Sequence, residues 1–431
     1  MKAIGLDIGT TSICGILADI HSGAVEKSIT LPNDSGLSSP NAWEKIQSPQ
    51  RILEIVHIIL SKLMCDGVVS IGVTGQMHGI LYVDAEGSAV SPLYTWQDGR
   101  GDLAFQNTTY ARFLNSATGY GLVTDFYNEK NGLIPETAEK FCTIHDFVVM
   151  KLCGNKAPAV HVSDAASFGL YDLKNNAFTI ENDRIPEVVH GVQTAGYYKN
   201  IPVTVAIGDN QASFIGSVKD QNAVLVNVGT GSQISVLSDE IYSVRGLETR
   251  PLYDDKYILV GSALCGGRSF AALECFFREV VFLATKEKCA SLYGPMLDAI
   301  DNLKETGLIF DNRFCGTREK PDLRGSIQNI SLENFTPENF IFGSLYAISD
   351  ELFQMYQKTG KTCSTLVGSG NGIRRNKKLR QMFEAAFSCK MNIPNQQEEA
   401  SFGAMLFSLA GAKVYDSIEE ARKIIQYEET R

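Results

Sequence analysis

The chain has 431 residues, of which 44% are hydrophobic and 20% are charged, and it carries a formal net charge of −10. This is the composition of a globular protein with two or three domains, and the negative charge argues against a nucleic-acid-binding surface, which would carry a basic stripe. A strand-like start in place of an apolar leader, and ten cysteines without the spacing of a zinc site, predict a cytoplasmic protein without membrane or nucleic-acid partners.

Two segments half a chain apart share one pattern, an apolar run, a short glycine-containing turn and a second apolar run. They cover residues 4–17 and 224–237, and each is typical of a β-hairpin. The turns consist of Gly9, Thr10, Thr11 and Ser12 in the first copy and of Gly229, Thr230, Gly231 and Ser232 in the second. Successive N–H groups in such turns can form a concave site for phosphate, although either hairpin alone could be purely structural. The repetition predicts two related domains, 1–208 and 209–431, with a nucleotide held between them.

Hydrophobic patterns elsewhere predict alternating strands and helices. Strands are expected at 68–73, 80–83, 201–207, 257–260 and 365–367. Helices are expected at 51–64, 268–284, 343–359, 376–387 and 397–410, with a polar helix at 417–429. This alternation indicates an α/β fold with mixed sheets flanked by helices.

A glycine-bracketed turn and a tryptophan segment carry polar side chains in the first half. Gln76, Met77 and His78 lie between Gly75 and Gly79, which implies close approach by another group. Trp96, Asp98 and Arg100 follow, and they combine a flat apolar wall with a charged acceptor and donor, as polyol sites do. The structural alternatives are a satisfied histidine, a core tryptophan and an ion pair in a turn.

Asp209 is the first candidate for catalysis. It follows an apolar strand, and ligands collect at strand ends in open α/β sheets. A carboxylate there could accept the proton of an attacking hydroxyl. The alternative is that Asp209 only caps a helix that starts near Gln211.

Three further features complete the candidate ligand contacts. Asp7 precedes the first turn, and carboxylates suit Mg²⁺, whereas Asn227 stands at the matching place in the second copy. Gly266 follows the strand at 257–260. A loop after the strand at 365–367 contains Gly368, Gly370 and Asn371.

Five blocks of the chain resemble the FGGY family of carbohydrate kinases, within the actin-like, heat-shock-chaperone-like and hexokinase-like superfamily. The blocks are Leu6-Asp-Ile-Gly-Thr-Thr-Ser12, Thr74-Gly-Gln-Met-His-Gly79, Trp96-Gln-Asp-Gly-Arg100, Ile207-Gly-Asp-Asn210, and Gly368-Ser-Gly370 with Glu398-Glu-Ala-Ser-Phe-Gly-Ala404. The resemblance covers essentially the whole chain. The third block and Arg375-Asn376 are most similar to sedoheptulokinases, and xylulose kinases are the next most similar.

The resemblance implies two actin-like, ribonuclease H-like domains with the active site in the cleft between them. It implies direct transfer of a phosphoryl group from ATP to a terminal hydroxyl of an open-chain ketose, with Asp209 as base and Asp7 organising Mg²⁺ through water. The implied product is sedoheptulose 7-phosphate; the alternatives are a pentulose kinase and a non-catalytic nucleotide switch or sugar sensor. A homodimer is a further expectation.

The same resemblance implies the binding residues. Sugar contacts are expected from Gln76, Met77, His78, Trp96, Asp98, Arg100 and Asn210. ATP contacts are expected from Gly9, Thr10, Thr11, Ser12, Gly229, Thr230, Gly231, Gly266, Gly368, Gly370 and Asn371.

Overall fold

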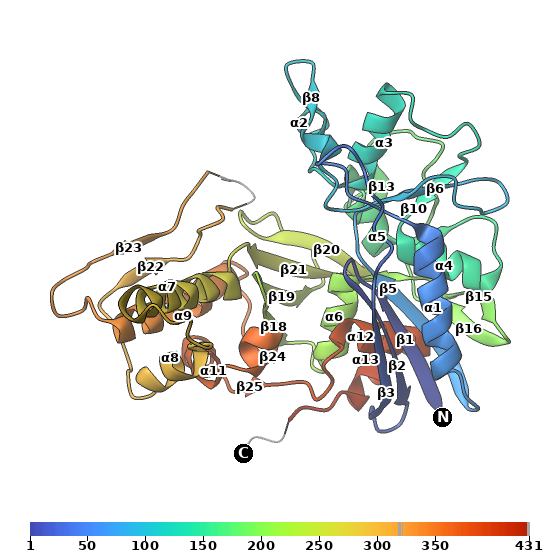
Figure 1. The fold of residues 1–431 in the computed structure, drawn as a ribbon. Helices are drawn as coiled ribbons and strands as arrows, with labels where there is room; N and C mark the ends of the chain where they lie inside the picture. Colours follow the sequence, from blue (N-terminus) through green and yellow to red (C-terminus); the bar gives the residue numbers. More distant parts are fainter. Residues whose placement is uncertain (318–319, 321, 429–431) are drawn as a thin grey trace.

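Two mixed sheets organise the computed structural model, which describes residues 1–317, 320 and 322–428 (Figure 1). The first sheet has the order β15-β16-β5-β1-β2-β3, and β17 pairs with β5 beyond β16. The second sheet has the order β20-β21-β19-β18-β24-β25. Helices flank both sheets, which confirms the predicted α/β class with mixed sheets.

The elements of the first half are as follows. Its main sheet contains β1 (Lys2–Ile8), β2 (Ser12–Asp19), β3 (Val25–Pro32), β5 (Val68–Gly75), β15 (Thr194–Tyr198), β16 (Ile201–Thr204) and β17 (Ile207–Gly208). Its short strands are β4 (Ile46–Gln47), β6 (Leu81–Val83), β7 (Leu93–Tyr94), β8 (Ala104–Phe105), β9 (Thr108–Thr109), β10 (Lys140–Cys142), β11 (Ala159–His161), β12 (Tyr171–Asp172), β13 (Ala177–Phe178) and β14 (Glu187–Val189). Its helices are α1 (Pro49–Leu63), a 3₁₀ turn η1 (Gly99–Asp102), α2 (Tyr110–Phe113), α3 (Gly121–Lys130), α4 (Ile144–Cys153) and α5 (Val162–Ser167).

The second half begins with α6 (Asp209–Ser217). Its strands are β18 (Ala223–Val228), β19 (Ser232–Ser238), β20 (Glu248–Tyr253), β21 (Lys256–Ala263), β22 (Ile309–Asp311), β23 (Ser326–Gln328), β24 (Thr365–Ser369) and β25 (Met391–Asn392). Its further helices are α7 (Gly267–Thr285), α8 (Tyr293–Ala299), α9 (Pro337–Gln357), α10 (Asn371–Arg374), α11 (Lys377–Phe387), α12 (Glu399–Gly411), α13 (Ile418–Ala421) and a 3₁₀ turn η2 (Arg422–Ile424).

The two predicted hairpins occupy equivalent places in their sheets. β1 runs antiparallel to β2 and parallel to β5, and β18 runs antiparallel to β19 and parallel to β24. Asp7 therefore stands opposite Thr74 of β5, and Asn227 stands opposite Ser369 of β24. The repeat seen in the sequence is a repeat of three-stranded units.

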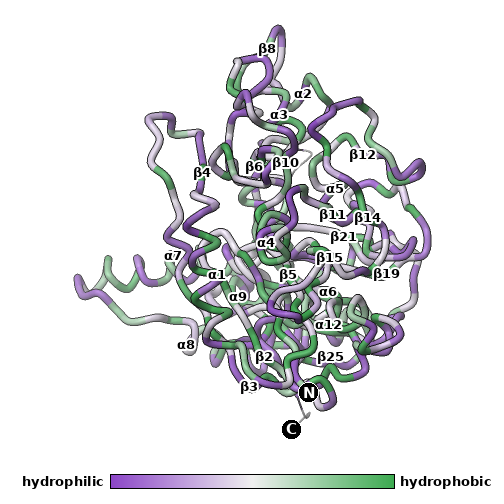
Figure 2. Tube along the Cα trace, turned by 90° about the vertical axis from the view of Figure 1, so that its right-hand side faces the viewer, coloured by the Kyte–Doolittle hydropathy of each residue, from purple (hydrophilic) through white to green (hydrophobic). Residues whose placement is uncertain are grey.

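Helix α12 joins the far end of the chain to the first sheet. It packs on β1, β5 and α6 at a distance that only glycines allow. A Cβ at Gly5 would lie 1.8 Å from the Ser401 carbonyl oxygen, and one at Gly72 would lie 1.8 Å from that of Ala404. Figure 2 shows hydrophobic segments around α1, β5 and α12 and hydrophilic ones in outer loops such as that at β8. Helix α12 belongs to the predicted second domain but packs on the sheet of the predicted first domain. The domain boundary at residue 208 therefore stays a prediction.

The predicted helices from 51–64 to 397–410 are confirmed with shifted ends. The prediction of a polar helix at 417–429 is wrong. Helical structure after Ser417 ends at Ile424, and Tyr427 instead forms a β-bridge with Pro394. The buried Arg422 side chain donates to the Val218 carbonyl and anchors the turn. Residue 429 lies outside the described residues. The predicted strand at 201–207 is also interrupted, since β16 ends at Thr204 and β17 starts at Ile207.

Over the described parts of the chain, none of the helices combines the length and the apolar character that a membrane crossing requires.

Candidate functional site

Two carboxylates flank the same end of β5. Asp7 lies on β1, opposite Thr74, and Asp209 directly follows Gly208, which pairs with Gly75. Burial raises the pKa of Asp7 to about 7, helped by the charges of Asp209 and Glu398. Burial also raises the pKa of Asp209 to about 6, although His145 and Arg250 oppose the shift. The site therefore holds more negative charge than its surroundings balance.

A magnesium ion would suit this set of donors. Carboxylate oxygens are hard ligands, and a divalent cation would favour the ionised form of Asp7, whose pKa is raised by burial and, to a smaller extent, by the charges of Asp209 and Glu398. Among the described residues, the one group whose ligand atoms already converge is a different one, His145, Asp146 and Asp164, and it is fully buried. Asp7 is therefore better suited to hold a magnesium ion through water, as predicted, than to coordinate it directly in a preformed cluster of ligands.

The first turn is hydrogen-bonded to several of the residues that the sequence predicted to bind ligands. Its backbone carbonyls are engaged by neighbouring side chains, since Asn33 Nδ2 donates to Gly9 O (2.8 Å) and Gln47 Nε2 to Thr10 O (2.9 Å). The Thr10 hydroxyl donates to Gln76 Oε1 (3.0 Å) and accepts from Trp96 Nε1 (3.0 Å). Three predicted site residues therefore form one chain of hydrogen bonds. Gln47 was missed, because it lies outside any motif.

Thr11 and Ser12 complete the first turn. Thr11 is exposed at its tip, and its carbonyl accepts from the Asn33 N–H at 2.9 Å. Ser12 opens β2.

The second turn lies against the N-terminus of α7. Gly267 N donates to Gly229 O (2.9 Å), and Arg268 N donates to Thr230 O (3.0 Å). A Cβ on Gly266 would lie 2.6 Å from the Gly231 carbonyl, so only glycine permits this packing. The 19-residue helix α7 directs the positive end of its dipole toward the turn. The arrangement suits an anion.

The loop at 368–371 borders the second turn on its other side. Gly370 has φ +82°, and a Cβ there would lie 2.6 Å from Val228 O. Asn371 is exposed at the start of α10. Gly368 is different, because a Cβ there would meet the buried Met391 sulfur at 2.4 Å. Packing explains Gly368, whereas Gly370 and Asn371 are accessible beside the turn.

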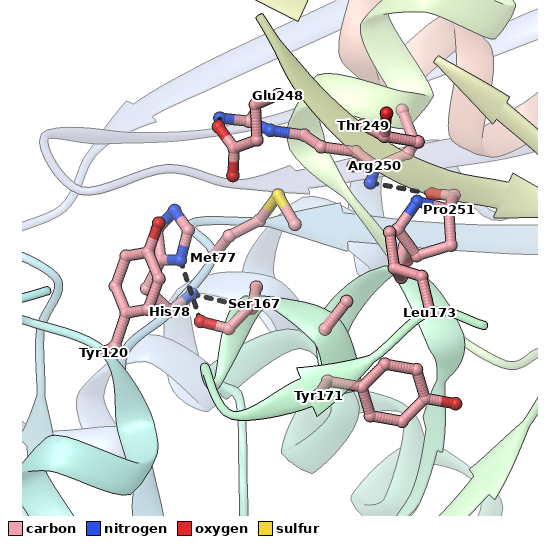
Figure 3. A pocket seen from close by; sticks show the side chains of 13 residues that line it. Met77, His78, Tyr120, Ser167, Tyr171, Leu173, Glu248, Thr249, Arg250 and Pro251 are labelled. Carbon is pink, nitrogen blue, oxygen red and sulfur yellow. Dashed lines mark hydrogen bonds and ion pairs between the residues drawn. The ribbon is translucent and has the colours of Figure 1, made fainter. Parts of the chain in front are cut away.

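A cavity of about 170 Å³ lies between the first half and β20 (Figure 3). Its lining includes Met77 and His78, which were predicted, and a set that was not. The further lining residues are Tyr120, Ser163, Ala166, Ser167, Tyr171, Leu173, Gln211, Glu248, Thr249, Arg250 and Pro251. Figure 3 shows Glu248 and Arg250 of β20 across the cavity from Tyr171. The walls combine aromatic faces with donors and acceptors, as polyol binding requires.

His78 is held in a strained backbone conformation by its neighbours. Its φ is +73°, its N–H donates to Ser167 Oγ (3.2 Å), and its Nδ1 lies 2.9 Å from Ser167 O. Its ring stacks on Tyr120 with centroids 4.4 Å apart. A non-glycine residue with positive φ is rare, and such strain is concentrated at functional sites.

Two amide oxygens on the first turn of α6 are buried without a hydrogen-bond partner. They belong to Asn210 and Gln211, the residues that follow Asp209. The Gln211 amide nitrogen is satisfied by Pro251 O at 3.0 Å, so its orientation is fixed and its oxygen stays unmatched. Unsatisfied buried acceptors call for an explanation, and the hydroxyl groups of a ligand in the adjoining cavity would be suitable donors.

Trp96 and the pair Asp98–Arg100 face different surroundings. Trp96 is 46% exposed beside the first turn, so it is not a core residue. Asp98 and Arg100 are 0% and 1% exposed and bind each other, with Arg100 Nε 2.7 Å from Asp98 Oδ1. Arg100 also contacts Glu44 (3.1 Å) and lies over the Tyr94 ring. The cavity lining does not include Asp98 or Arg100, and their geometry supports a structural ion pair in place of the predicted sugar contact.

Known proteins with a similar sequence and structure are carbohydrate kinases. Residues 2–226 match the model of the FGGY family of carbohydrate kinases, N-terminal domain. The chain is 27% identical to the sedoheptulokinase of Mus musculus over 94% of this chain and 97% of that protein. It is 22% identical to a xylulose kinase of Lactococcus lactis over 99% of this chain and 91% of that protein. The crystal structure of xylulose kinase from Rhodospirillum rubrum has a TM-score of 0.84 at 17% identity, covering 100% of this chain and 93% of that one. These similarities confirm the predicted family and fold.

Proposed function

Because the chain belongs to the FGGY family of carbohydrate kinases, we propose that it transfers the terminal phosphoryl group of ATP to a terminal hydroxyl of sedoheptulose. The observation that carries this proposal is the position of Asp209. It stands at the end of β17, next to Asp7 and the unmatched amide oxygens of α6, whose Gln211 lines the cavity. Sugar hydroxyl and phosphate can therefore meet at one carboxylate.

Asp209 acts as the base. Phosphoryl transfer needs a positioned acceptor hydroxyl and a group that takes its proton. With a pKa of about 6, the carboxylate is mostly ionised at pH 7 and yet basic enough to accept that proton. Nearby positive charges oppose the effect of burial and so hold the pKa in this useful range.

The nucleotide phosphates bind between the two turns. Backbone N–H groups of Gly9 to Ser12 and of Thr230 and Gly231 serve as donors, and the α7 dipole adds positive potential. Asp7 would hold Mg²⁺ through water, which would supply charge neutralisation at the phosphates. Gly266 shapes the second turn, and Gly370 with Asn371 borders the adenosine.

The sugar occupies the cavity at Met77 and His78. Met77 covers a carbon face, while Gln76 and His78 contact hydroxyls and Trp96 forms a wall near the reacting end. Asn210 and Gln211 accept from sugar hydroxyls through their unmatched oxygens. Asp98 and Arg100 support this wall from behind.

Sedoheptulose is expected to give a higher kcat/KM than xylulose, ribulose or glycerol. Gln211 and residues of β20 line the cavity with hydrogen-bond acceptors and donors beyond the end of the sugar that reacts. A site that hydrogen-bonds a substrate hydroxyl discriminates strongly against an analogue that lacks it. The measurement is ATP-dependent ADP release with each sugar and without sugar.

The controls distinguish the alternatives. A higher kcat/KM for xylulose would establish a pentulose kinase, the activity named for the similar structure from Rhodospirillum rubrum. ADP release that no ketose stimulates, despite nucleotide binding, would establish a nucleotide switch or sensor.

Substitution of Gly229 by Val is expected to raise the KM for ATP about tenfold, because one hydrogen bond to a charged phosphate contributes about 1.5 kcal/mol. The nearest atom to a Cβ at this position is 4.0 Å away, so the turn itself accepts the side chain and only the ligand is obstructed. Gly9 does not offer this test, since a Cβ there would lie 2.7 Å from Ser12 O and distort the turn.

The matched control is Gly294→Val, because Gly294 lies in the same half of the chain with nothing within 4 Å of its Cβ position. The KM for the ketose should stay unchanged in both variants. An equal rise in both KM values for Gly229→Val would show that the second turn is only structural.

A further inference from the structure

A buried charged pair that no step above uses lies behind the proposed base. It consists of His145 on α4 and Asp164 on α5, both 0% exposed, with His145 Nε2 3.0 Å from Asp164 Oδ1. The neighbouring Asp146 has another function, since it accepts a hydrogen bond from the Thr143 hydroxyl (2.6 Å) in the capping box of α4. A buried ion pair contributes little net stability by itself, so its presence asks for another reason.

Both members of the pair abut the strand end that carries Asp209. A Cβ on Gly75 would lie 3.0 Å from His145 Nδ1, and Gly75 is the strand partner of Gly208. On the other side, Gly208 N donates to the hydroxyl of Ser163 (3.1 Å), the residue before Asp164. The Ser163 hydroxyl in turn donates to Asp164 Oδ2 (3.5 Å), so hydrogen bonds connect the pair to β17 immediately before the base.

His145 carries a positive charge in this position. Burial lowers its pKa, but Asp164, together with Asp146 and Asp209, outweighs burial and raises it to about 9. The charged groups around it come from four elements, namely Asp146 on α4, Asp164 on α5, Asp209 on α6 and Asp7 on β1. Arg250 on β20 is a further cation that acts on Asp209. His145 is therefore the cation placed among these carboxylates.

We propose that His145, held as an imidazolium by Asp164, is a positioning residue that keeps the Asp209 carboxylate ionised and aligned for proton transfer. The proposal rests on the proposed function of Asp209. The mechanism is electrostatic, because a nearby positive charge favours the ionised form of a carboxylate.

The test is the pH profile of kcat in His145→Gln. The acid limb, which lies near pH 6 if Asp209 is the base, should move upward by about one pH unit when the charge is removed. Activity should then fall about fivefold at pH 6 and less than twofold at pH 8. His145→Lys keeps the charge and should leave the limb near its original position.

The matched control is His161→Gln. His161 belongs to the same buried network, since its Nδ1 lies 2.9 Å from the Ser163 hydroxyl, but burial lowers its pKa to about 4. It is uncharged at neutral pH, so its removal should not move the acid limb. A limb shifted equally by both variants would overturn the proposal.

A second readout separates this proposal from the kinase assignment. The ¹³C resonance of the Asp209 carboxyl reports its pKa without any turnover, and that pKa should rise in His145→Gln. An unshifted carboxyl pKa, or a loss of activity by one factor at every pH, would make the pair purely structural. If His145→Gln does not fold, His145→Asn serves as the uncharged variant, and an unshifted limb in that variant would also overturn the proposal.

Discussion

Replacement of Asp209 by Asn is expected to lower kcat by at least about 100-fold, the contribution of a positioned general base. Asn keeps the size of the side chain and its place at the start of α6, but it cannot accept the proton of the sugar hydroxyl. The KM values for ATP and ketose should change little, because the amide can still accept a hydrogen bond. Steady-state kinetics with both substrates measure the effect.

Stability provides the control for this variant. Burial raises the pKa of Asp209 to about 6, so the ionised carboxylate destabilises the fold at pH 7, and the neutral Asn should not lower the melting temperature. Asp220→Asn is the matched substitution, since Asp220 is exposed beyond the other end of α6. Near-normal kcat in Asp209→Asn would remove Asp209 from the role of base.

Replacement of Asp98 by Ala is expected to reduce the free energy of unfolding by about 3 kcal/mol, because it leaves the buried Arg100 guanidinium without its closest counter-ion. Glu44 and Asn128 still contact Arg100 in this variant. The expected loss of stability is therefore at the lower end of the range for a broken buried ion pair. Denaturant unfolding measures the change.

A double-mutant cycle sharpens the result. Asp98→Ala combined with Arg100→Met removes both charges, so its loss of stability should be smaller than the sum of the two single losses. A large rise in the KM for the ketose without loss of stability would instead support the sugar contact that the sequence predicted.

The features that local patterns encode could be predicted from the sequence. The two hairpins were correct because alternating apolar runs around a glycine turn specify a hairpin without help from distant residues. The sequence predicted Asp98 and Arg100 as sugar contacts beside Trp96 and offered an ion pair as the alternative. The sequence could not show whether the two side chains face the cavity or each other, because their direction is set by η1, which turns Asp98 and Arg100 inward against Tyr94.

The residues that the sequence missed are brought to the cavity by tertiary packing. Tyr120, Gln211 and Arg250 come from three separate elements and stand in no common motif. His145 and Asp164 were missed for the same reason, since a lone histidine near an aspartate in sequence shows nothing about burial. Only the pairing of β17 with β5 reveals that they lie behind Asp209.

The packing of α12 on the first sheet also constrains how the protein is made. Gly5 and Gly72 are translated long before the backbone that they contact, at Ser401 and Ala404. Domains generally fold in order of synthesis, and this one cannot be completed in that order, because one face of its sheet is covered only after α12 has been made. The nascent chain therefore exposes that face until α12 has been made, and transiently exposed apolar surface of this kind favours aggregation. A chain that terminates before residue 399 would leave the first half without its cover, even though every residue of β1 and β5 is present.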